Sequence, residues 1–492
     1  MNFPYRYVAR IIVEAETPLA IGSDSKEFDQ DAPVTKDCND MPIIPGTAIT
    51  GFLRAKLGKT EIFGDEATDN ESQTKGSNFI CSDAYLLDAN YQAHQQPTNL
   101  LENEHMQFFE NLPRRQHVKI NHFGAAEKEG LFDREIVYKG SRFKFEIALE
   151  LENEDTDNNF DKILNRLCAN DFYIGGGQFN NFGELKVLNI EKRCFEKNTT
   201  DYLEICADLN KPLNGKNHSF EIRTELYEEK IPLSGKNSFF HFGAGYGDDE
   251  VDNVNYKEPI LIWTKNNKNG KFKTELIRKF VIPGTSIKGA LSHRVAFYYN
   301  KENGIFVDNL ITDIESTAQQ LEDKYDIETY QLADNLDDLE KQKIELQNQL
   351  KALDKEKPNT TIDFSKYVGT NNQGVRDLFG CEKNDQLKDE NNGSLGNVIF
   401  KDIYLDKNTK QTIFYHNKID RYTGGTIEGA LFSEKVLIID TETLYYKTTK
   451  KLDKTYLDMA LDDFKNGMLP IGGLVNKGHG IFVEIKDKEN GK

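Results

Sequence analysis

An acidic loop near the start of the chain carries the side chains best suited to chemistry. The stretch GSDSKEFDQDAPVTKD, residues 22–37, contains Asp24, Asp29, Asp31 and Asp37. A carboxylate beside a phosphodiester can help to place a divalent cation or can accept a proton. A second acidic stretch, GAGYGDDEVDNVNYKEPI, contains Asp248, Asp249 and Asp252. Acidic loops are also common as solvated surface, so this pattern alone leaves both interpretations open.

Each acidic loop is followed, after a strand, by a proline and a glycine that predict the start of a helix. The two stretches are IIPGTAITGFL from Ile43 and VIPGTSIKGAL from Val281. Proline ends a strand and threonine is a good N-cap. The predicted corners are Pro45, Gly46 and Thr47, and Pro283, Gly284 and Thr285. Free N–H groups at a helix start bind anions, and Lys288 could reach a phosphate there. A structural strand-to-helix corner is the alternative.

These matching stretches belong to a tandem duplication. Five blocks recur in the same order, which chance does not explain. The paired blocks begin at Ile43 and Val281, Glu61 and Asp377, Ser77 and Gly396, His117 and His416, and Phe172 and Leu469. The duplication predicts two domains, residues 1–200 and 215–492, which we call the first and the second copy.

Each copy is predicted to be an α+β unit. An alternating strand leads into the acidic loop, a helix follows, and the second half is rich in strand and turn residues. This order favours helices packed on an antiparallel sheet. The second copy carries an insertion at about 301–370 with a heptad seam: Leu332, Leu336, Leu339, Lys343, Leu346, Leu350 and Leu353. The seam predicts a helix or helical hairpin that packs on its own domain or docks on a partner subunit. The first copy has a predicted surface insertion at 88–113.

Two further motifs occur in both copies. The glycine-rich turns GGGQFNNFG (175–183) and GGLVNKGHG (472–480) each precede a strand, which disfavours a dinucleotide loop. Their glycines, Gly175 and Gly176 and Gly472 and Gly473, would let a polynucleotide backbone approach, although a plain turn is the alternative. The segments 120–131 and 419–431 predict hairpins with His122, Phe123, Arg421 and Tyr422 at their tips. Such side chains can stack on bases or contact phosphates, yet exposed hairpins without function are also common.

Composition narrows the function classes. The formal charge of −19 weighs against a generic nucleic-acid binder, although a local groove can still be basic. Six scattered cysteines without a CxxC pair indicate reduced thiols and a cytoplasmic protein. No apolar run reaches the ~18 residues of a membrane span, so no membrane partner is expected. The histidines form no metal-binding spacing.

The ordered set of motifs resembles the RAMP superfamily. It is most similar to "Cas-seven"-like backbone subunits of type III CRISPR effector complexes, and two copies in one chain resemble the fused subunit of III-D-like systems. The resemblance implies two ferredoxin-like (RRM-like) domains with thumb β-hairpins. It also implies binding to guide (crRNA) and target RNA, other CRISPR effector subunits as partners, and a role in antiviral defence.

The same resemblance implies a catalytic aspartate. In the family it lies in the loop before a small residue, Pro and Val, and DAPV points to Asp31. In the second copy KEPI places Lys257 there, so Asp248, Asp249 or Asp252 is expected to substitute if that copy cuts. The implied cofactor is a divalent metal, with Mg²⁺ expected, and its ligands are unknown. The RNA-contacting set comprises Gly46, Thr47, Arg54, Lys119, His122, Phe123, Gly175, Gly176, Gly284, Thr285, Lys288, Arg421, Tyr422, Gly472 and Gly473.

Three functions follow from these observations. The first is a metal-dependent endoribonuclease that cuts complementary target RNA at regular intervals within an RNA-guided complex. The second is a scaffold that binds guide RNA without cutting. The third, a guide-processing endoribonuclease, is disfavoured by the duplication and by the thumb-like hairpins.

Overall fold

The computed structural model describes residues 3–22, 33–64, 76–100, 102–121, 124–203, 205–265, 271–306, 367–381, 393–449 and 452–486. The chain divides into two compact units, and this division does not follow the duplication. The larger unit comprises residues 1–290, 396–453 and 463–492, and the smaller one comprises 291–395 and 454–462. The predicted leucine seam of the insertion lies outside the described residues.

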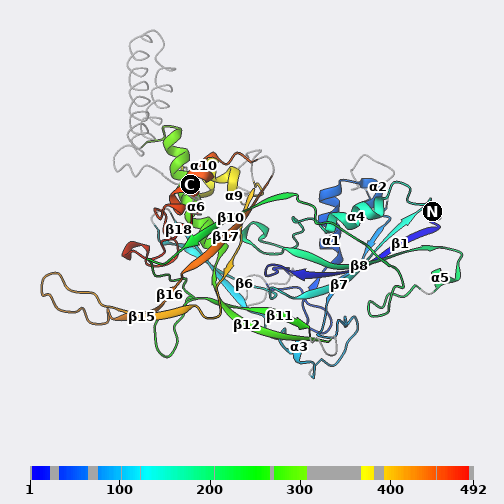
Figure 1. Ribbon diagram of the computed structural model, residues 1–492, viewed down its shortest axis with the longest axis horizontal. Helices are drawn as coiled ribbons and strands as arrows, with labels where there is room; N and C mark the ends of the chain where they lie inside the picture. The colour runs from blue at the N-terminus through cyan, green and yellow to red at the C-terminus, as the bar shows by residue number, and fades with distance from the viewer. Residues whose placement is uncertain are drawn as a thin grey trace, which may run out of the picture. The chain divides into compact units, whose positions relative to one another are not determined.

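The first copy is built around an antiparallel sheet with two helices on one face (Figure 1). Its main strands are β1 (Tyr5–Ala15), β7 (Arg142–Leu151) and β8 (Leu185–Glu196), with β1 in the middle. Shorter strands extend the sheet: β2 (Ile43–Ile44), β3 (Phe79–Cys81), β4 (Ala84–Leu86) and β9 (Lys216–Asn217). The helices α1 (Gly46–Leu57) and α4 (Asn159–Leu167) lie on the face formed by every second β1 residue, because Ala9, Ile11 and Val13 alternate inward.

The second copy repeats this order of elements. Its sheet has the order β13 (Val398–Phe400), β17 (Thr441–Thr449), β10 (Leu226–Ser234) and β18 (Val483–Glu484). Along the chain, α6 (Gly284–Glu302) follows the first strand and α10 (Thr455–Lys465) precedes the last. Both copies therefore have the strand–helix–strand–strand–helix–strand order of a ferredoxin-like domain, and the predicted tandem α+β fold is confirmed.

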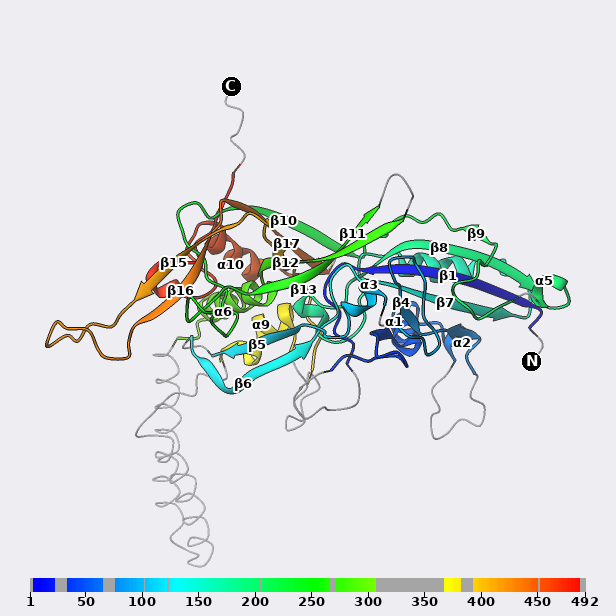
Figure 2. The ribbon, with the colours of Figure 1, turned by 90° about the horizontal axis from the view of Figure 1, so that it is seen from below.

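Each copy also carries a two-stranded hairpin outside its main sheet (Figure 2). In the first copy it consists of β5 (Arg114–Ile120) and β6 (Ala126–Glu135). In the second copy it consists of β15 (Lys410–His416) and β16 (Phe432–Ile438), and only the bridge between Ile419 and Thr426 continues the pairing toward the tip. We call these the first and second thumb hairpins.

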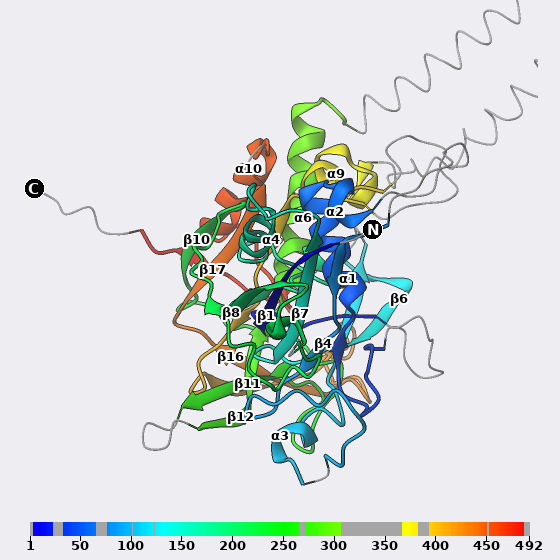
Figure 3. The same ribbon diagram turned by 90° about the vertical axis from the view of Figure 1, so that its right-hand side faces the viewer.

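A long hairpin of the second copy packs against the first copy. It consists of β11 (Lys257–Lys265) and β12 (Phe272–Ile282), and Figure 3 shows it beside α3 (Glu104–Gln107). Leu261 joins the core of the first copy, and the Trp263 indole N–H donates to the carbonyl of Gly140 at 2.7 Å. The α3 residue Met106 is buried, so the segment predicted as a surface insertion is instead anchored in this joint.

The remaining short elements complete the chain. They are α2 (Thr60–Phe63), η1 (Gln178–Asn180), α5 (Thr200–Leu203), η3 (Gly369–Asn371), α9 (Gln373–Phe379), β14 (Ile403–Tyr404) and η4 (Val475–Lys477). The six cysteines are free thiols, as expected. Within the described ranges, no helix is both long and apolar enough to cross a membrane.

Candidate functional site

The acidic loop of the second copy is fastened to the second thumb hairpin. The Asp252 carboxylate accepts hydrogen bonds from the Ser433 backbone N–H at 2.7 Å and from the Ser433 hydroxyl at 3.1 Å. Asn253 continues the contact, because its N–H donates to the carbonyl of Ser433 at 3.1 Å. These hydrogen bonds, led by the backbone one, lower the pKa of Asp252. The loop thus presents an exposed, ionised carboxylate at the base of the thumb.

Backbone hydrogen bonds show which residue of the first copy corresponds to Asp252. Thr35 N–H donates to the carbonyl of Ile21 at 2.8 Å, and Tyr256 N–H donates to that of Phe242 at 2.7 Å. The next strand then pairs in the same way, Ile43 with Thr35 and Val281 with Tyr256. Thr35 and Tyr256 are therefore equivalent. Counting back four residues along each sequence pairs Asp31 with Asp252.

The alignment of Asp31 with Lys257 is therefore wrong. By the same hydrogen-bond register, Lys257 corresponds to Lys36, since Lys36 bridges Pro42 and Lys257 pairs with Phe280. KEPI resembles DAPV in sequence, but the two stretches are not structurally equivalent. The second copy continues from this point into the β11–β12 hairpin, whereas the first copy has a tight turn here. The second copy retains an aspartate at the position that the family resemblance marks as catalytic.

The other acidic candidates differ in their surroundings. Asp248 is tied down structurally: it pairs with Lys435 at 2.6 Å and accepts from the N–H groups of Glu250 and Val251. Asp249 is exposed. Asp24, Asp29 and Asp31 lie outside the described residues. Asp37 holds a tight turn, since its carboxylate accepts the N–H groups of Asn39 and Met41.

The glycine-rich turns pack against the strand ends that lead into the acidic loops. Gly176 N–H donates to the carbonyl of Ala20 at 2.9 Å, and Gly473 N–H donates to that of His241 at 2.7 Å. A Cβ at Gly175 would lie 2.5 Å from the Ala20 oxygen, and one at Gly472 would lie 2.7 Å from the His241 oxygen. Both glycines have positive φ, so no other residue fits easily. The glycines therefore hold each turn against the strand end that leads into the acidic loop.

Sequence reasoning missed one basic residue at this place, Arg134 on β6. Its guanidinium lies 5.6 Å from the ring of Phe182 and against Gly177 of the glycine-rich turn. Burial lowers the pKa of Arg134. No carboxylate of the described residues pairs with it. The equivalent residue of the second copy is Glu434, so no repeated motif marked this position.

Ser433 was missed as well. It occupies the position of Asp133 in the first copy, which lies two residues before the end of β6, and it is the second residue of β16. The repeated block that contains both was visible in the sequence, but only the fold brings Ser433 to the acidic loop.

The helix corners differ from the prediction. The helices begin at Gly46 and Gly284, so Thr47 and Thr285 are not N-caps. Instead, Gly46 N–H donates to Asp83 at 2.8 Å and Gly284 N–H donates to Asp402 at 2.7 Å. The glycines are needed because a Cβ would lie 2.5 Å from the Cys81 oxygen or 2.2 Å from the Phe400 oxygen. A carboxylate on the first amide is unfavourable for anion binding at that atom, and contacts of Thr47, Thr285 and Arg54 with RNA stay predictions.

Lys288 contacts the glycine-rich turn of the first copy. Its ammonium donates to the Asn180 side chain at 3.0 Å and to the Phe179 carbonyl at 3.3 Å. Burial lowers its pKa to about 8. This side chain therefore joins the two copies, and these internal contacts disfavour the phosphate contact that the sequence predicted.

The thumb tips are only partly described. Tyr422 is fully exposed beside Arg421, in a turn closed by the Asp420 carboxylate. Lys119 pairs with Glu127 at 2.8 Å on the first thumb hairpin. His122 and Phe123 lie outside the described residues. An exposed aromatic ring at the tip can stack on a base.

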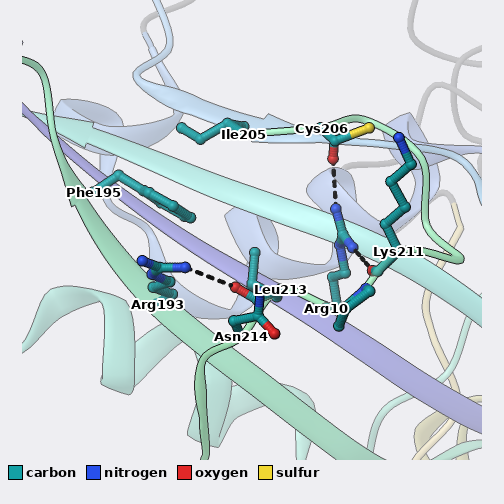
Figure 4. A pocket seen from close by; sticks show the side chains of 9 residues that line it. Arg10, Arg193, Phe195, Ile205, Cys206, Lys211, Leu213 and Asn214 are labelled. Atoms are coloured by element: carbon teal, nitrogen blue, oxygen red, sulfur yellow. Dashed lines mark hydrogen bonds between the residues drawn. The ribbon is translucent and has the colours of Figure 1, made fainter. Parts of the chain in front are cut away.

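The outer face of the first sheet is covered by the segment that joins the copies (Figure 4). Arg10 on β1 donates to the carbonyls of Cys206 and Lys211, and Arg193 on β8 donates to that of Leu213 at 3.3 Å. Leu213 packs with Val8 and Phe195. The joining segment thus covers this part of the sheet face and lines one side of a pocket of about 220 Å³.

The described residues contain no group of three or more His, Cys, Asp or Glu side chains placed to hold a metal ion. Mg²⁺ is usually held by one or two carboxylates together with waters and substrate phosphates. The Asp252 carboxylate oxygen that accepts nothing from Ser433 can bind an ion that arrives with a phosphate. It does not fit an ion held by the protein alone.

Comparison with known proteins identifies relatives over most of the chain. The RAMP superfamily matches residues 12–186 and 240–483. The "CRISPR system Cms endoribonuclease Csm3" of Methanothermobacter thermautotrophicus is 26% identical over 225 residues, covering 39% of this chain and 88% of that protein. The protein of the same name from Methanocaldococcus jannaschii is 25% identical over 214 residues, covering 38% of this chain and 80% of its own length.

Proposed function

The chain belongs to the RAMP superfamily, with one match in each copy, and on this basis we propose that it is a double backbone subunit of an RNA-guided type III CRISPR complex. It binds guide RNA and cuts the complementary target RNA at each copy. The names of its relatives support an endoribonuclease. Target choice rests on base pairing with the guide, as in other RNA-guided effectors.

The observation that carries this proposal is the equivalence of Asp31 and Asp252. Both copies have an aspartate four residues before the strand pair that the hydrogen bonds of Thr35 and Tyr256 define. In the second copy this aspartate lies at the base of the thumb hairpin, on Ser433. A pure scaffold does not need an aspartate at this place in both copies.

The protein contributes position and charge to the reaction. The thumb hairpin separates bases of the guide–target duplex, which frees the target backbone for attack by a ribose 2′-hydroxyl in line with the leaving oxygen. The lowered pKa of Asp252 keeps it ionised at neutral pH, which rules it out as the general acid. Its role is to orient the hydroxyl or a cation through its charge.

We propose that the aspartate of each copy would help to hold a divalent cation, Mg²⁺ by preference, when target RNA is bound. When bound, such an ion offsets the charge that develops on the phosphate oxygens. Asp31 and Asp252 are the residues that would hold it, together with water and RNA.

The complex purified through this chain tests the proposal. With a guide of known sequence it should cut a complementary RNA and leave a non-complementary RNA intact, and a chelator should stop cleavage without releasing the guide. If the complex binds target RNA but does not cleave it with any divalent metal, the result would contradict the nuclease proposal and support the scaffold function.

A further inference from the structure

A buried arginine of the first copy is held by a group of four side chains of the second copy. Arg115 on β5 donates to Glu258 from Nε at 2.9 Å and from Nη2 at 2.5 Å, and to Asp402 from Nη1 at 2.9 Å. The hydroxyls of Tyr256 and Tyr404 each donate to Glu258 at 2.7 Å. We call Tyr256, Glu258, Asp402 and Tyr404 the second-copy socket. Burial alone would lower the pKa of Arg115, but Asp402 and Glu258 raise it well above its usual value.

The first copy contains the same socket, and it is an open pocket. The register that pairs Thr35 with Tyr256 also pairs Asp37 with Glu258, and the matching blocks pair Asp83 with Asp402 and Tyr85 with Tyr404. A pocket of about 320 Å³ is lined by Thr35, Asp37, Asp83 and Tyr85, with Ile43 and Pro45. We call it the first-copy socket.

The carboxylates of the first-copy socket retain capacity for a cation. Asp83 accepts Gly46 N–H through Oδ1, as Asp402 accepts Gly284 N–H. Asp37 also uses Oδ1 for its turn. Among the described residues, the Oδ2 atoms of Asp37 and Asp83 have no hydrogen-bond or ion-pair partner. Burial raises the pKa of Tyr85, and Asp83 and Asp37 add to it, as Glu258 and Asp402 do for Tyr404. The rim also carries the exposed Lys36, which corresponds to Lys257 at the occupied socket.

We propose that the first-copy socket binds an arginine side chain of a different protein subunit, as the second-copy socket binds Arg115. A planar guanidinium fits because two carboxylates converge with a tyrosine hydroxyl, and Arg115 shows this geometry filled. The occupant is not a second copy of this chain. The thumb residue equivalent to Arg115 is Phe414, which packs on Phe239 and His479. A phenylalanine side chain has neither a hydrogen-bond donor nor a positive charge for Asp37 and Asp83.

This inference concerns a protein interface and does not depend on cleavage. The assembled complex provides the first test, by native mass spectrometry of particles purified through a tag on this chain. The double variant Asp37→Asn, Asp83→Asn keeps the oxygens that cap Asn39 and Gly46 but removes both charges. We expect the fraction of particles that retain one neighbouring protein subunit to fall about tenfold or more relative to wild type. The matched control Asp157→Asn removes an exposed charge elsewhere and should retain that subunit. A photo-crosslinker at Tyr85 should reach an arginine-bearing segment of the same subunit.

Retention of every neighbour in the double variant, or crosslinks from position 85 to RNA or to another copy of this chain, would overturn the proposal. A second arm uses the chain alone and remains valid if no complex forms. Phe414→Arg supplies the missing guanidinium, so sedimentation should show concentration-dependent self-association that wild type lacks. Adding Asp37→Asn and Asp83→Asn to that variant should abolish it. Self-association that persists in the triple variant would count against the socket. So would a Phe414→Arg variant that does not self-associate although its circular dichroism spectrum matches that of wild type.

Discussion

Ser433 on the second thumb hairpin shares three hydrogen bonds with Asp252 of the acidic loop. Its N–H and its hydroxyl donate to the Asp252 carboxylate at 2.7 and 3.1 Å, and its hydroxyl oxygen accepts the Asp252 N–H at 3.3 Å. This pair connects the element that would distort the RNA duplex with the carboxylate that would act on it. Substitution of the Ser433 side chain leaves the hydrogen bond of the backbone N–H in place and removes only those of the hydroxyl. The two contributions can therefore be separated by experiment.

Ser433→Ala should slow the cut made by the second copy by about tenfold. The variant loses the hydroxyl's hydrogen bonds with the carboxylate and the N–H of Asp252, which costs about 1–2 kcal/mol in orienting the carboxylate. The hydroxyl bond also lowers the pKa of Asp252, so the acidic limb of the pH–rate profile should move to higher pH. Ser433→Thr should restore both. Quantified cleavage products across pH provide the measurement. An unchanged pH profile with a slower rate would indicate a structural effect only.

Arg115→Met should lower the free energy of unfolding by about 3–5 kcal/mol, because Glu258 and Asp402 would remain buried without a counter-charge. Lys119→Met is the control on the same strand. Its pair with Glu127 is exposed, so its loss should cost at most about 1 kcal/mol. Urea unfolding followed by circular dichroism compares the two. Equal effects would show that the buried pairs contribute no more than a surface pair.

Arg134→Gln should weaken RNA binding and reduce the slope of log affinity against log salt by about one phosphate contact. The reason is that its guanidinium lies at the glycine-rich turn without a paired carboxylate among the described residues. Lys288→Met should leave that slope nearly unchanged, because Lys288 already binds Asn180 within the protein. Binding isotherms at several salt concentrations test both. A larger loss of slope in Lys288→Met would reverse the assignment.

Acid should destabilise the first thumb hairpin through His117. Burial, together with Arg115 and Arg134, lowers the pKa of His117 to about 4, below about 6.5 for an unfolded histidine. The folded state thus prefers the neutral ring. The neutral His117 ring therefore adds at most about 3 kcal/mol to the free energy of unfolding. This contribution is complete above pH 6.5 and is lost as the pH falls toward 4. His117→Phe keeps a ring against Phe132 and should flatten this part of the stability profile. Parallel profiles for the two proteins would contradict the assignment.

The repeated blocks were sufficient to predict two tandem α+β domains, because strand alternation, the helix corners and the glycine-rich turns are local signals. The ferredoxin-like order followed only from the family resemblance. The repeated blocks could not predict the register of the second acidic loop. KEPI resembles DAPV in letters, but the hydrogen bonds of Thr35 and Tyr256 place it elsewhere. Nor could they predict the cap of Gly46, because Asp83 lies 37 residues away along the chain. The Arg115 contacts join the two copies, so no single copy contains the information for them.

The most direct test of the account is a map of the cuts in a long complementary RNA made by complexes that carry Asp31→Asn, Asp252→Asn or both. Each single variant should lose one cut and keep the other, and the double variant should lose both while guide and target binding remain near wild type. Guide and target binding report whether each variant is folded, so losses of cleavage alone would report transition-state stabilisation. If Asp252→Asn left every cut in place, or if both cuts survived in the double variant, the equivalence of the two aspartates would not be a functional one.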